Sequence, residues 1–441
     1  MVGYSILNMF MLWAKKICRS SSAKLFVSGY CAVLALLFTL LLLACSNIDI
    51  PTNLKNSTGS YLALDDSEYP YAGLPRIVIE TDEFTQVKDR ETEVPARLQV
   101  YGKDSPTDEI KFLTIRGRGN TSWVTMPKKS YKLEFNDKYA FLGMPQNRDW
   151  ALIANYADKT LIKNYLAYHL SATLGLPYTP KCQFVELFLN KEYQGVYLLT
   201  ETIKVAKKRV NIPENDSSYL VEVDSKYKKD EQVFLSEQGK PFHVLSPKNA
   251  SYASLSLLQN HINSFEEFLK TPNTTEIANW IDIDSYIKYY WIQEYSKNFD
   301  GAFYTSVFFT WEKGGPIKMG PVWDFDLAFG GHPDTLNDAP EGWYIKKTYW
   351  THRLFKKTAF RLKAYSFFDE HLQEFKAVED TIESLRNRLR NAAKNNFTRW
   401  NILNSTEHEN HIRSYSSYDE AIDDLIAWHR KRLAWIKKEL E

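Results

Sequence analysis

Two aspartates stand one residue apart in the segment GPVWDFDLAFG, residues 320–330, where most neighbours are apolar. A buried carboxylate without a partner is energetically costly, so Asp324 and Asp326 need nearby cations or a metal ion. If this segment is an extended strand, its side chains alternate between two faces. Both carboxylates then point the same way, with Cα atoms ~6.6 Å apart, while Trp323 and Phe325 pack inward. This geometry predicts a site for one hard cation or a pair of them.

A β-hairpin is expected to bring a third carboxylate to this pair. The strand AFYTSVFFTW, the turn EKGGP and the strand IKMGPVWDFDLAFG predict two antiparallel strands that turn near Gly314. This register places Asp326 opposite Ala302, next to Asp300, although a β-bulge would shift it by a residue or two. Three such aspartates have the layout of phosphoryl-transfer sites, in which one Asp orients the attacking hydroxyl and others hold metal ions. A solvated acidic rim, or a calcium ion that only stabilises the loop, would leave the same pattern.

Other motifs narrow the chemistry. No GxSxG, HExxH or CxxC pattern occurs, which removes the usual support for a serine hydrolase or a zinc protease. The histidines, His243 among them, show no ligand spacing, and a set of oxygen ligands favours Mg²⁺ or Mn²⁺ over zinc. Tryptophans such as Trp311 and Trp323 could form a sugar-binding platform, but scattered tryptophans more often belong to the core.

Two basic strands could supply a phosphate-binding surface. The segments RGRGNTSW and PKKSYKLEF predict strands joined by a bend that contains Gly and Ser. The spacing differs from the GxxxxGK[ST] phosphate loop, and a charged strand face is often simply solvated. The candidate residues are Arg116, Arg118, Lys128, Lys129 and Lys132.

The periodicity divides the chain into two lobes of an α+β protein. Residues 76–205 read as a β-rich N-terminal lobe with one helix, which Asp158 would cap and Gly175 would end. Residues 206–441 read as a mainly helical C-terminal lobe that carries the hairpin. In the strand KKSYKLEF, Tyr131 and Phe135 are expected to face the core.

The N-terminus has the features of a targeting segment. Four basic residues precede a long apolar run, and the order LLLACS resembles a bacterial lipobox. Residues 1–44 would be a lipoprotein signal peptide, Cys45 the lipidated residue, and 45–75 a flexible tether rich in Ser, Asn and Pro. The alternative is an uncleaved signal anchor, and both interpretations place the folded part outside the cytoplasm. Cys182 would then be the lone cysteine of the folded part, so no disulfide framework is expected.

Charge argues against nucleic acid as a partner. Lys and Arg number 55 against 54 Asp and Glu, a formal net charge of +1. The charged residues of the leader are all basic. Without the leader the balance is slightly acidic, whereas nucleic-acid-binding domains are strongly basic.

Four motifs in order resemble the spore-coat protein H (CotH) kinase family. They are IRGRGNTSW…PKKSYKLEF, ANYADKTLIKNYLAYHL, VELFLNKEYQGVYLLTETI and KNFDGAFYTSVFF…IKMGPVWDFDLAFG. The resemblance runs from about Ile77 to the C-terminal helix. It implies an atypical protein-kinase-like two-lobed fold with a small ATP-binding N-terminal lobe and a helical lobe, and it implies ATP with Mg²⁺ or Mn²⁺ as the cofactor. It also implies an extracytoplasmic enzyme that phosphorylates Ser or Thr of a partner protein.

The resemblance assigns roles residue by residue. Asp300 in KNFDG matches the catalytic-loop aspartate, Asp324 in WDFD matches the metal-binding aspartate, and Asp326 would be a second ligand. Many kinases place an Asn for the second metal shortly after the catalytic Asp, and GAFYTSVFF has none, so a two-metal site would depend on Asp326. The residues expected near the nucleotide are Lys129, Lys132 and Arg118 at the phosphates, Glu201 at the adenine edge, and Asn155 and Lys159 at the start of the helix.

These observations predict a lipid-anchored kinase of the bacterial surface that acts on an unidentified surface protein. Two other functions fit the same residues. One is a catalytically inactive kinase-like module for adhesion or carbohydrate binding. The other is a metal-dependent phosphohydrolase.

Overall fold

The computed structural model describes residues 61–228, 231–272, 276–333, 335, 338–405 and 412–441. The expected signal peptide 1–44, the lipidation site Cys45 and the first part of the expected tether lie outside these residues. Among the residues described, no helix is both long and apolar enough to cross a bilayer.

The described end of the expected tether is packed rather than free. Leu62 is buried, and its N–H donates to Gln99 Oε1 at 2.9 Å. Asp66 pairs with the buried Arg76, and Leu74 has no exposed surface. Composition predicts flexibility here, but a few apolar side chains find partners on the adjoining barrel.

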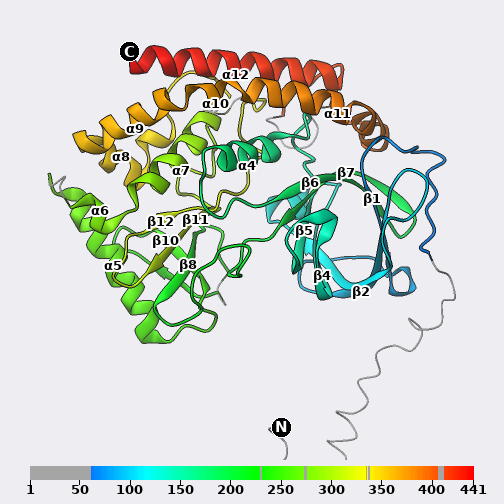
Figure 1. Ribbon diagram of the computed structural model, residues 1–441, viewed down its shortest axis with the longest axis horizontal. Helices are drawn as coiled ribbons and strands as arrows, with labels where there is room; N and C mark the ends of the chain where they lie inside the picture. The colour runs from blue at the N-terminus through cyan, green and yellow to red at the C-terminus, as the bar shows by residue number, and fades with distance from the viewer. Residues whose placement is uncertain (1–60, 229–230, 273–275, 334, 336–337, 406–411) are drawn as a thin grey trace, which may run out of the picture. The chain divides into compact units, whose positions relative to one another are not determined.

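Seven strands of the N-terminal part close into a barrel in the order β1-β2-β3-β4-β5-β7-β6 (Figure 1). β1 closes the barrel by pairing parallel to β6, and the other neighbours are antiparallel. Tyr131, Leu133 and Phe135 are buried in its apolar interior, as the alternation predicts. The strands are β1 (Arg76–Thr81), β2 (Val94–Tyr101), β3 (Lys111–Arg118), β4 (Ser130–Tyr139), β5 (Asn147–Ile153), β6 (Cys182–Leu189) and β7 (Glu192–Glu201), with the short helices η2 (Asp82–Phe84), α3 (Thr121–Thr125) and η3 (Phe141–Gly143) between them.

One longer helix, α4 (Lys163–Thr173), connects β5 to β6. It begins five residues after Asp158, the predicted cap. The Asp158 carboxylate accepts from Thr160 N at 2.8 Å and from Lys163 N at 2.9 Å, so it still ties down the start of the helix.

The C-terminal part contains a second sheet in the order β12-β11-β8-β10-β9. Its hairpin is the predicted one, with Phe309 opposite Met319 and Thr310 opposite Lys318. Three further strands, which the sequence pattern did not reveal, extend this sheet: β8 pairs with β11, β10 with β8, and β9 with β10. The strands are β8 (Ser218–Val223), β9 (Val233–Leu235), β10 (Pro241–Ser246), β11 (Val307–Glu312) and β12 (Lys318–Met319).

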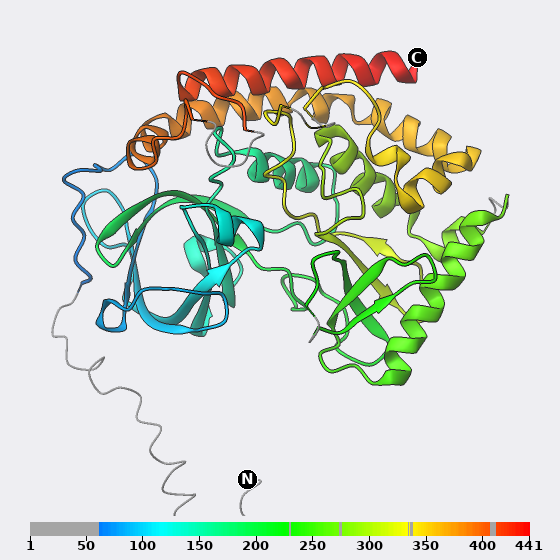
Figure 2. The same cartoon turned by 180° about the vertical axis from the view of Figure 1, so that it is seen from behind.

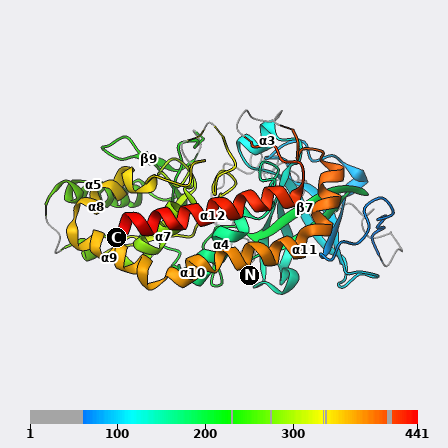
Figure 3. The same cartoon turned by 90° about the horizontal axis from the view of Figure 1, so that it is seen from above.

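Helices form most of the remaining C-terminal part. In Figure 2, α5 lies beside the second sheet, where Tyr219 of β8 contacts Ser254. Figures 1 and 3 show α12 along α11. The helices are α5 (Tyr252–Lys270), α6 (Ile277–Trp280), α7 (Ile283–Ser296), η4 (Ile345–Lys347), α8 (Tyr349–Lys356), α9 (Thr358–Glu370), α10 (Leu372–Lys376), α11 (Val378–Arg399) and α12 (Tyr418–Leu440).

A second large core joins these helices to the second sheet. Trp311, Trp323 and Trp350 are all buried in it, which agrees with the core interpretation of the tryptophans. α11 also holds the barrel, because Asn396 Oδ1 accepts from Val196 N at 3.0 Å and from Lys128 Nζ at 2.9 Å. The protein is thus α+β, with a β-rich N-terminal part and a helical C-terminal part.

Candidate active site

The segment that carries Asp324 and Asp326 is not a strand. β12 ends at Met319, and no strand is assigned between Gly320 and Gly330. Pro321 has no N–H to donate to a sheet, and Asp324 has a left-handed backbone with φ 65°. The prediction that strand alternation puts the two carboxylates on one face was therefore wrong in its reasoning.

Contacts from two helices hold this segment instead. The N–H of Phe325 donates to Asn164 Oδ1 of α4 at 2.8 Å. The carbonyl of Asp324 accepts from Asn298 Nδ2 at 3.0 Å, just after α7. Phe325, the residue between the two aspartates, is fully buried and anchors the segment.

Asp300 is positioned by the end of α7. Lys297 ends the helix in a left-handed conformation, and its Nζ donates to Ala339 O at 2.6 Å and Glu341 O at 2.7 Å. A Cβ at Gly301 would lie 2.2 Å from Gln293 Oε1, so a larger residue directly after the aspartate would require the Gln293 side chain to move. The segment around Asp300 is therefore held on both sides.

The three aspartates do come together, as expected. Asp324 and Asp326 share a side-chain hydrogen bond, and each of the three aspartates shifts the pKa of at least one of the others. Burial first, and then the charge of Asp324, raises the pKa of Asp300 to about 7. Burial first, and then Asp324 and Asp300, raises the pKa of Asp326 well above its usual range. Asp324 and Asp326 keep some exposed surface, yet protein atoms crowd them closely enough for burial to be the main cause.

Two more acids and a histidine lie beside this group. Glu222 and Asp224, at the end of β8, and His243 of β10 each offer a ligand atom, and these atoms lie within 4.8 Å of one another. Asp224 also accepts from Thr305 Oγ1 at 2.7 Å. Burial first, and then the charges of Asp224 and Asp324, raises the pKa of Glu222 well above its usual range. The expectation that the histidines take no part in a ligand set fails for His243, because β10 pairs it directly opposite Glu222.

Three cations act on the carboxylates. Arg118, at the end of β3, lies with its guanidinium carbon 5.0 Å from the centre of the Trp323 ring, and its charge opposes the rise in the pKa of Asp324. Lys163 of α4 acts on Asp326 and donates to Gly330 O at 2.6 Å. Lys226, after β8, acts on both Asp300 and Asp324. The sequence pattern had indicated only Arg118, since the other two have no local signal.

This set of donors suits a hard divalent cation. Several carboxylate oxygens from separate segments converge, and their charges raise one another's pKa values. Mg²⁺ and Mn²⁺ prefer oxygen ligands of this kind. Asp324 and Asp326 are the residues that would hold such an ion.

Comparison with known proteins decides the family. The family model described as CotH kinase protein matches residues 115–436. This chain belongs to the CotH family. It is also 24% identical over 206 residues to a protein of Bacillus subtilis (strain 168) described as inner spore coat protein H. That match covers 46% of this chain and 55% of the relative, so the chain spans about half the length of its curated relative.

The lysines that the CotH resemblance placed near phosphates are occupied by protein partners. Lys129 Nζ donates to Trp123 O at 2.5 Å. Lys132 Nζ lies 2.9 Å from Glu134 and 3.2 Å from Asp149. Among the described residues, neither lysine forms an ion pair with the three aspartates.

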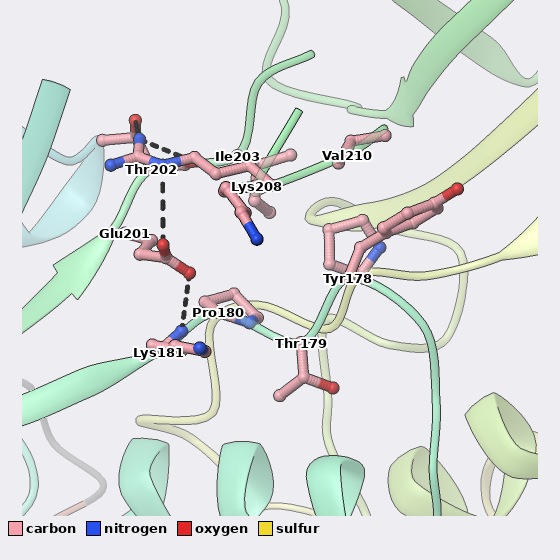
Figure 4. A pocket seen from close by; sticks show the side chains of 11 residues that line it. Tyr178, Thr179, Pro180, Lys181, Glu201, Thr202, Ile203, Lys208 and Val210 are labelled. Atoms are coloured by element: carbon pink, nitrogen blue, oxygen red, sulfur yellow. Dashed lines mark hydrogen bonds and ion pairs between the residues drawn. The ribbon is translucent and has the colours of Figure 1, made fainter. Parts of the chain in front are cut away.

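Glu201 lies at a different pocket, shown in Figure 4. It is the last residue of β7, and its Oε2 accepts from Lys181 N at 3.0 Å while Oε1 lies 3.8 Å from Arg209 Nε. Burial is the main cause of its raised pKa. The residues that line this pocket come from the segments 178–181, 201–203 and 208–210 with Pro321, and none of the three aspartates is among them.

Asn155 and Lys159 also differ from their expected placement, because both are tied to the protein interior. Asn155 donates to Leu161 O at 3.1 Å and accepts from Asn164 at 3.0 Å. Lys159 Nζ donates to three backbone carbonyls in the connection between α11 and α12, at 2.6 to 3.0 Å. These hydrogen bonds hold the segment that leads into α4.

Proposed function

We propose that this protein is a kinase that transfers a phosphoryl group from a metal-bound nucleotide, ATP in the simplest case, to a Ser or Thr hydroxyl of a partner protein. The observation that carries the proposal is the convergence of Asp300, Asp324 and Asp326, three crowded carboxylates whose pKa values stay raised despite the cations near them, in a chain of the CotH family. Structural ion pairs are compensated, whereas a group of carboxylates with raised pKa values is typical of functional sites.

The proposed fold is a two-lobed, kinase-like arrangement in which the barrel and the helical part each contribute to the site. Arg118 comes from the barrel, Asp300 from the end of α7, and Asp324 from the segment after β12. Phosphoryl-transfer sites commonly combine a metal-holding Asp with a second Asp that orients the hydroxyl. Asp326, and Asp224 with Glu222, would supply the ligands that kinases with a catalytic-loop Asn obtain from that residue.

The side chains can be assigned to the steps of the transfer. The oxygen of the acceptor hydroxyl bonds to the γ-phosphorus, and Asp300 accepts the proton that this hydroxyl loses. The bond from that phosphorus to the β–γ bridging oxygen breaks, and its electron pair leaves with the nucleoside diphosphate. Arg118 is placed to bind phosphate oxygens. A divalent cation at Asp324 and Asp326 would neutralise phosphate charge.

Location is part of the proposal. The relative's description as an inner spore coat protein supports a coat or surface location. The leader and the LLLACS motif support a lipid anchor at Cys45 and an extracytoplasmic, membrane-attached folded part. Mass spectrometry of the N-terminal peptide from the native host tests the anchor. We expect a diacylglyceryl group on Cys45 and its absence in the Cys45→Ser variant.

Substitution of the aspartates tests the transfer. Asp300→Asn and Asp324→Asn should each lower the rate of autophosphorylation, or of phosphorylation of an added partner, by at least about 10²-fold with Mg²⁺ or Mn²⁺. Asp284→Asn is the matched control, because this exposed residue of α7 forms a surface ion pair with Lys288 at 2.8 Å. Wild-type rates in both active-site variants would refute the assignment. Release of free phosphate without labelling of the acceptor would instead support a phosphohydrolase. A melting temperature that nucleotide and metal together leave unchanged would support a non-catalytic module.

A further inference from the structure

The segment that follows Asp300 has no cation of its own. Its next residues are Gly301, Ala302, Phe303 and Tyr304. A metaphosphate-like group in transfer carries negative charge on its outer oxygens, and a nearby positive side chain stabilises that charge. Such a cation must therefore come from another part of the chain.

The turn after β8 is fastened to this same segment. The N–H of Ser225 donates to Tyr304 O at 2.8 Å. Asp224 Oδ1 accepts from Lys226 N at 2.8 Å and from Thr305 Oγ1 at 2.7 Å. Lys226 is thus carried by a turn that is hydrogen-bonded to the residues directly beyond Asp300.

The Lys226 ammonium lies between the helical part and the barrel. Its Nζ is 5.7 Å from the centre of the Tyr304 ring and 3.5 Å from Thr121 Oγ1, in the bend between β3 and β4. It lies close enough to Asp300 and Asp324 for its charge to oppose the rise in both pKa values. This position faces both the proposed base and the proposed metal ligand.

The two other lysines near the site are committed to backbone carbonyls, and Arg118 is already assigned to phosphate oxygens in the proposed function. Lys163 Nζ donates to Gly330 O at 2.6 Å, and Lys297 Nζ donates to two carbonyls. Arg118 lies against Trp323. Lys226 is exposed, and within the described parts of the chain it forms no ion pair shorter than 4.0 Å. A long, exposed ammonium next to a carboxylate group is suited to binding a phosphate oxygen.

We propose that Lys226 is a catalytic residue of the phosphoryl transfer, which contacts an outer oxygen of the γ-phosphoryl group while that group moves from the nucleotide to the acceptor hydroxyl. The inference rests on the proposed function. Lys226 keeps its proton throughout, the acceptor proton goes to Asp300, and the electron pair of the broken P–O bond leaves with the diphosphate. The specific contribution of Lys226 is recognition of the third phosphate.

The test compares Lys226→Met with two matched variants. Lys226→Arg keeps the charge, and Lys228→Met removes the next lysine of the same connection, which pairs with the exposed Glu91 at 2.9 Å. We expect Lys226→Met to lower kcat about 10²-fold and to raise the KM for ATP, because the contact to the third phosphate is lost in the bound nucleotide as well as in the transition state. Lys226→Arg should recover most of that loss, and Lys228→Met should stay within about twofold of wild type.

A binding measurement separates recognition of the third phosphate from a structural role. By calorimetry with Mg²⁺, the wild type should bind a non-hydrolysable ATP analogue more tightly than ADP, and Lys226→Met should lose that preference while ADP affinity is unchanged. Lys226→Gln repeats the test with a polar side chain. Equal kcat and equal nucleotide preference in wild type and Lys226→Met would overturn the inference and leave the proposed function standing. A wild type that binds no metal nucleotide and transfers no phosphate would overturn both.

Discussion

The two ends of one stretch of chain hold buried charge in opposite ways. Near the end of α7, Glu294 pairs with Arg432 of α12 at 2.8 Å, and both side chains have no exposed surface. The Glu294 carboxylate also accepts from Tyr344 N at 2.9 Å and Lys346 N at 2.7 Å. Arg432 donates further to backbone carbonyls, among them that of Gly342 at 2.8 Å. Every charge in this pair has a partner.

Six residues later the balance is different. Asp300 is 7% exposed, and the charge of Asp324 adds to the effect of burial on its pKa. Burial first, and then the charges of Asp324 and Asp300, raise the pKa of Asp326, and the charge of Lys163 opposes this rise. The contrast teaches that burial of charge does not by itself identify a site. The compensated pair holds α12 to α7, whereas the carboxylates with raised pKa values cost stability, which agrees with the binding role proposed for them.

The largest expected effect comes from breaking the compensated pair. Arg432→Met leaves Glu294 buried without its partner, which should lower the free energy of unfolding by about 3–5 kcal/mol. Arg430→Met, two residues away and paired with Glu379 at the surface, should cost less than about 1 kcal/mol. Urea denaturation of the two variants measures the difference. Similar losses in both would show that the buried pair has no special weight.

The uncompensated group should respond with the opposite sign. Asp326→Asn removes a charge that the native state disfavours, so at pH 8 in EDTA it should raise the free energy of unfolding by about 1–2 kcal/mol. Glu294→Gln, a matched removal of one buried carboxylate charge, should be destabilising under the same conditions. Denaturant midpoints with unchanged slopes are the measurement. A destabilised Asp326→Asn would mean that Lys163 already compensates this carboxylate.

Arg118 and Lys129 should likewise differ in how much they contribute to nucleotide binding. Arg118 faces the uncompensated carboxylates, so Arg118→Met should weaken binding of Mg²⁺-ADP about tenfold, or ~1.4 kcal/mol. Lys129 is engaged by Trp123, so Lys129→Met should change that affinity less than twofold. Isothermal titration calorimetry on both variants decides between them. The reverse order would restore Lys129 as the phosphate-binding residue.

The smallest expected effect is on pH dependence without metal. The pKa of Asp300 rises from an ordinary value near 3.8 to about 7, so between these values the native state binds a proton that the unfolded state lacks. This contribution to stability is complete below pH ~4 and is lost as the pH rises through about 7. In EDTA the melting temperature should therefore fall by about 2–4 °C from pH 6 to pH 8. Asp300→Asn should flatten this slope, and an equally steep slope in that variant would assign it to other groups.

Much of the fold could be predicted because its signals are local. The alternation of Tyr131, Leu133 and Phe135 predicts a strand with one buried face, and the structure has β4 there. The hairpin of β11 and β12 follows from two apolar runs around a Gly-Gly turn. The CotH family was also correctly identified from four motifs in order.

The site could be predicted only in part, since its geometry depends on distant contacts. Asp324 and Asp326 meet Asp300 as expected, yet the reason is a left-handed turn held by Asn164 and Asn298 rather than strand alternation. No local pattern around these residues indicates such a turn.

By itself, the sequence determined the α+β composition, most strands of the N-terminal part, the family and the three aspartates that the site is built around. These are properties of residue type and short-range spacing, which survive in any correct fold. Only the tertiary structure decided which charges meet: it joined β8 to β10, bringing Glu222 beside His243, and placed Lys226 next to Asp300. Electrostatic interactions depend on distance and burial, and both are set by pairings between segments tens of residues apart.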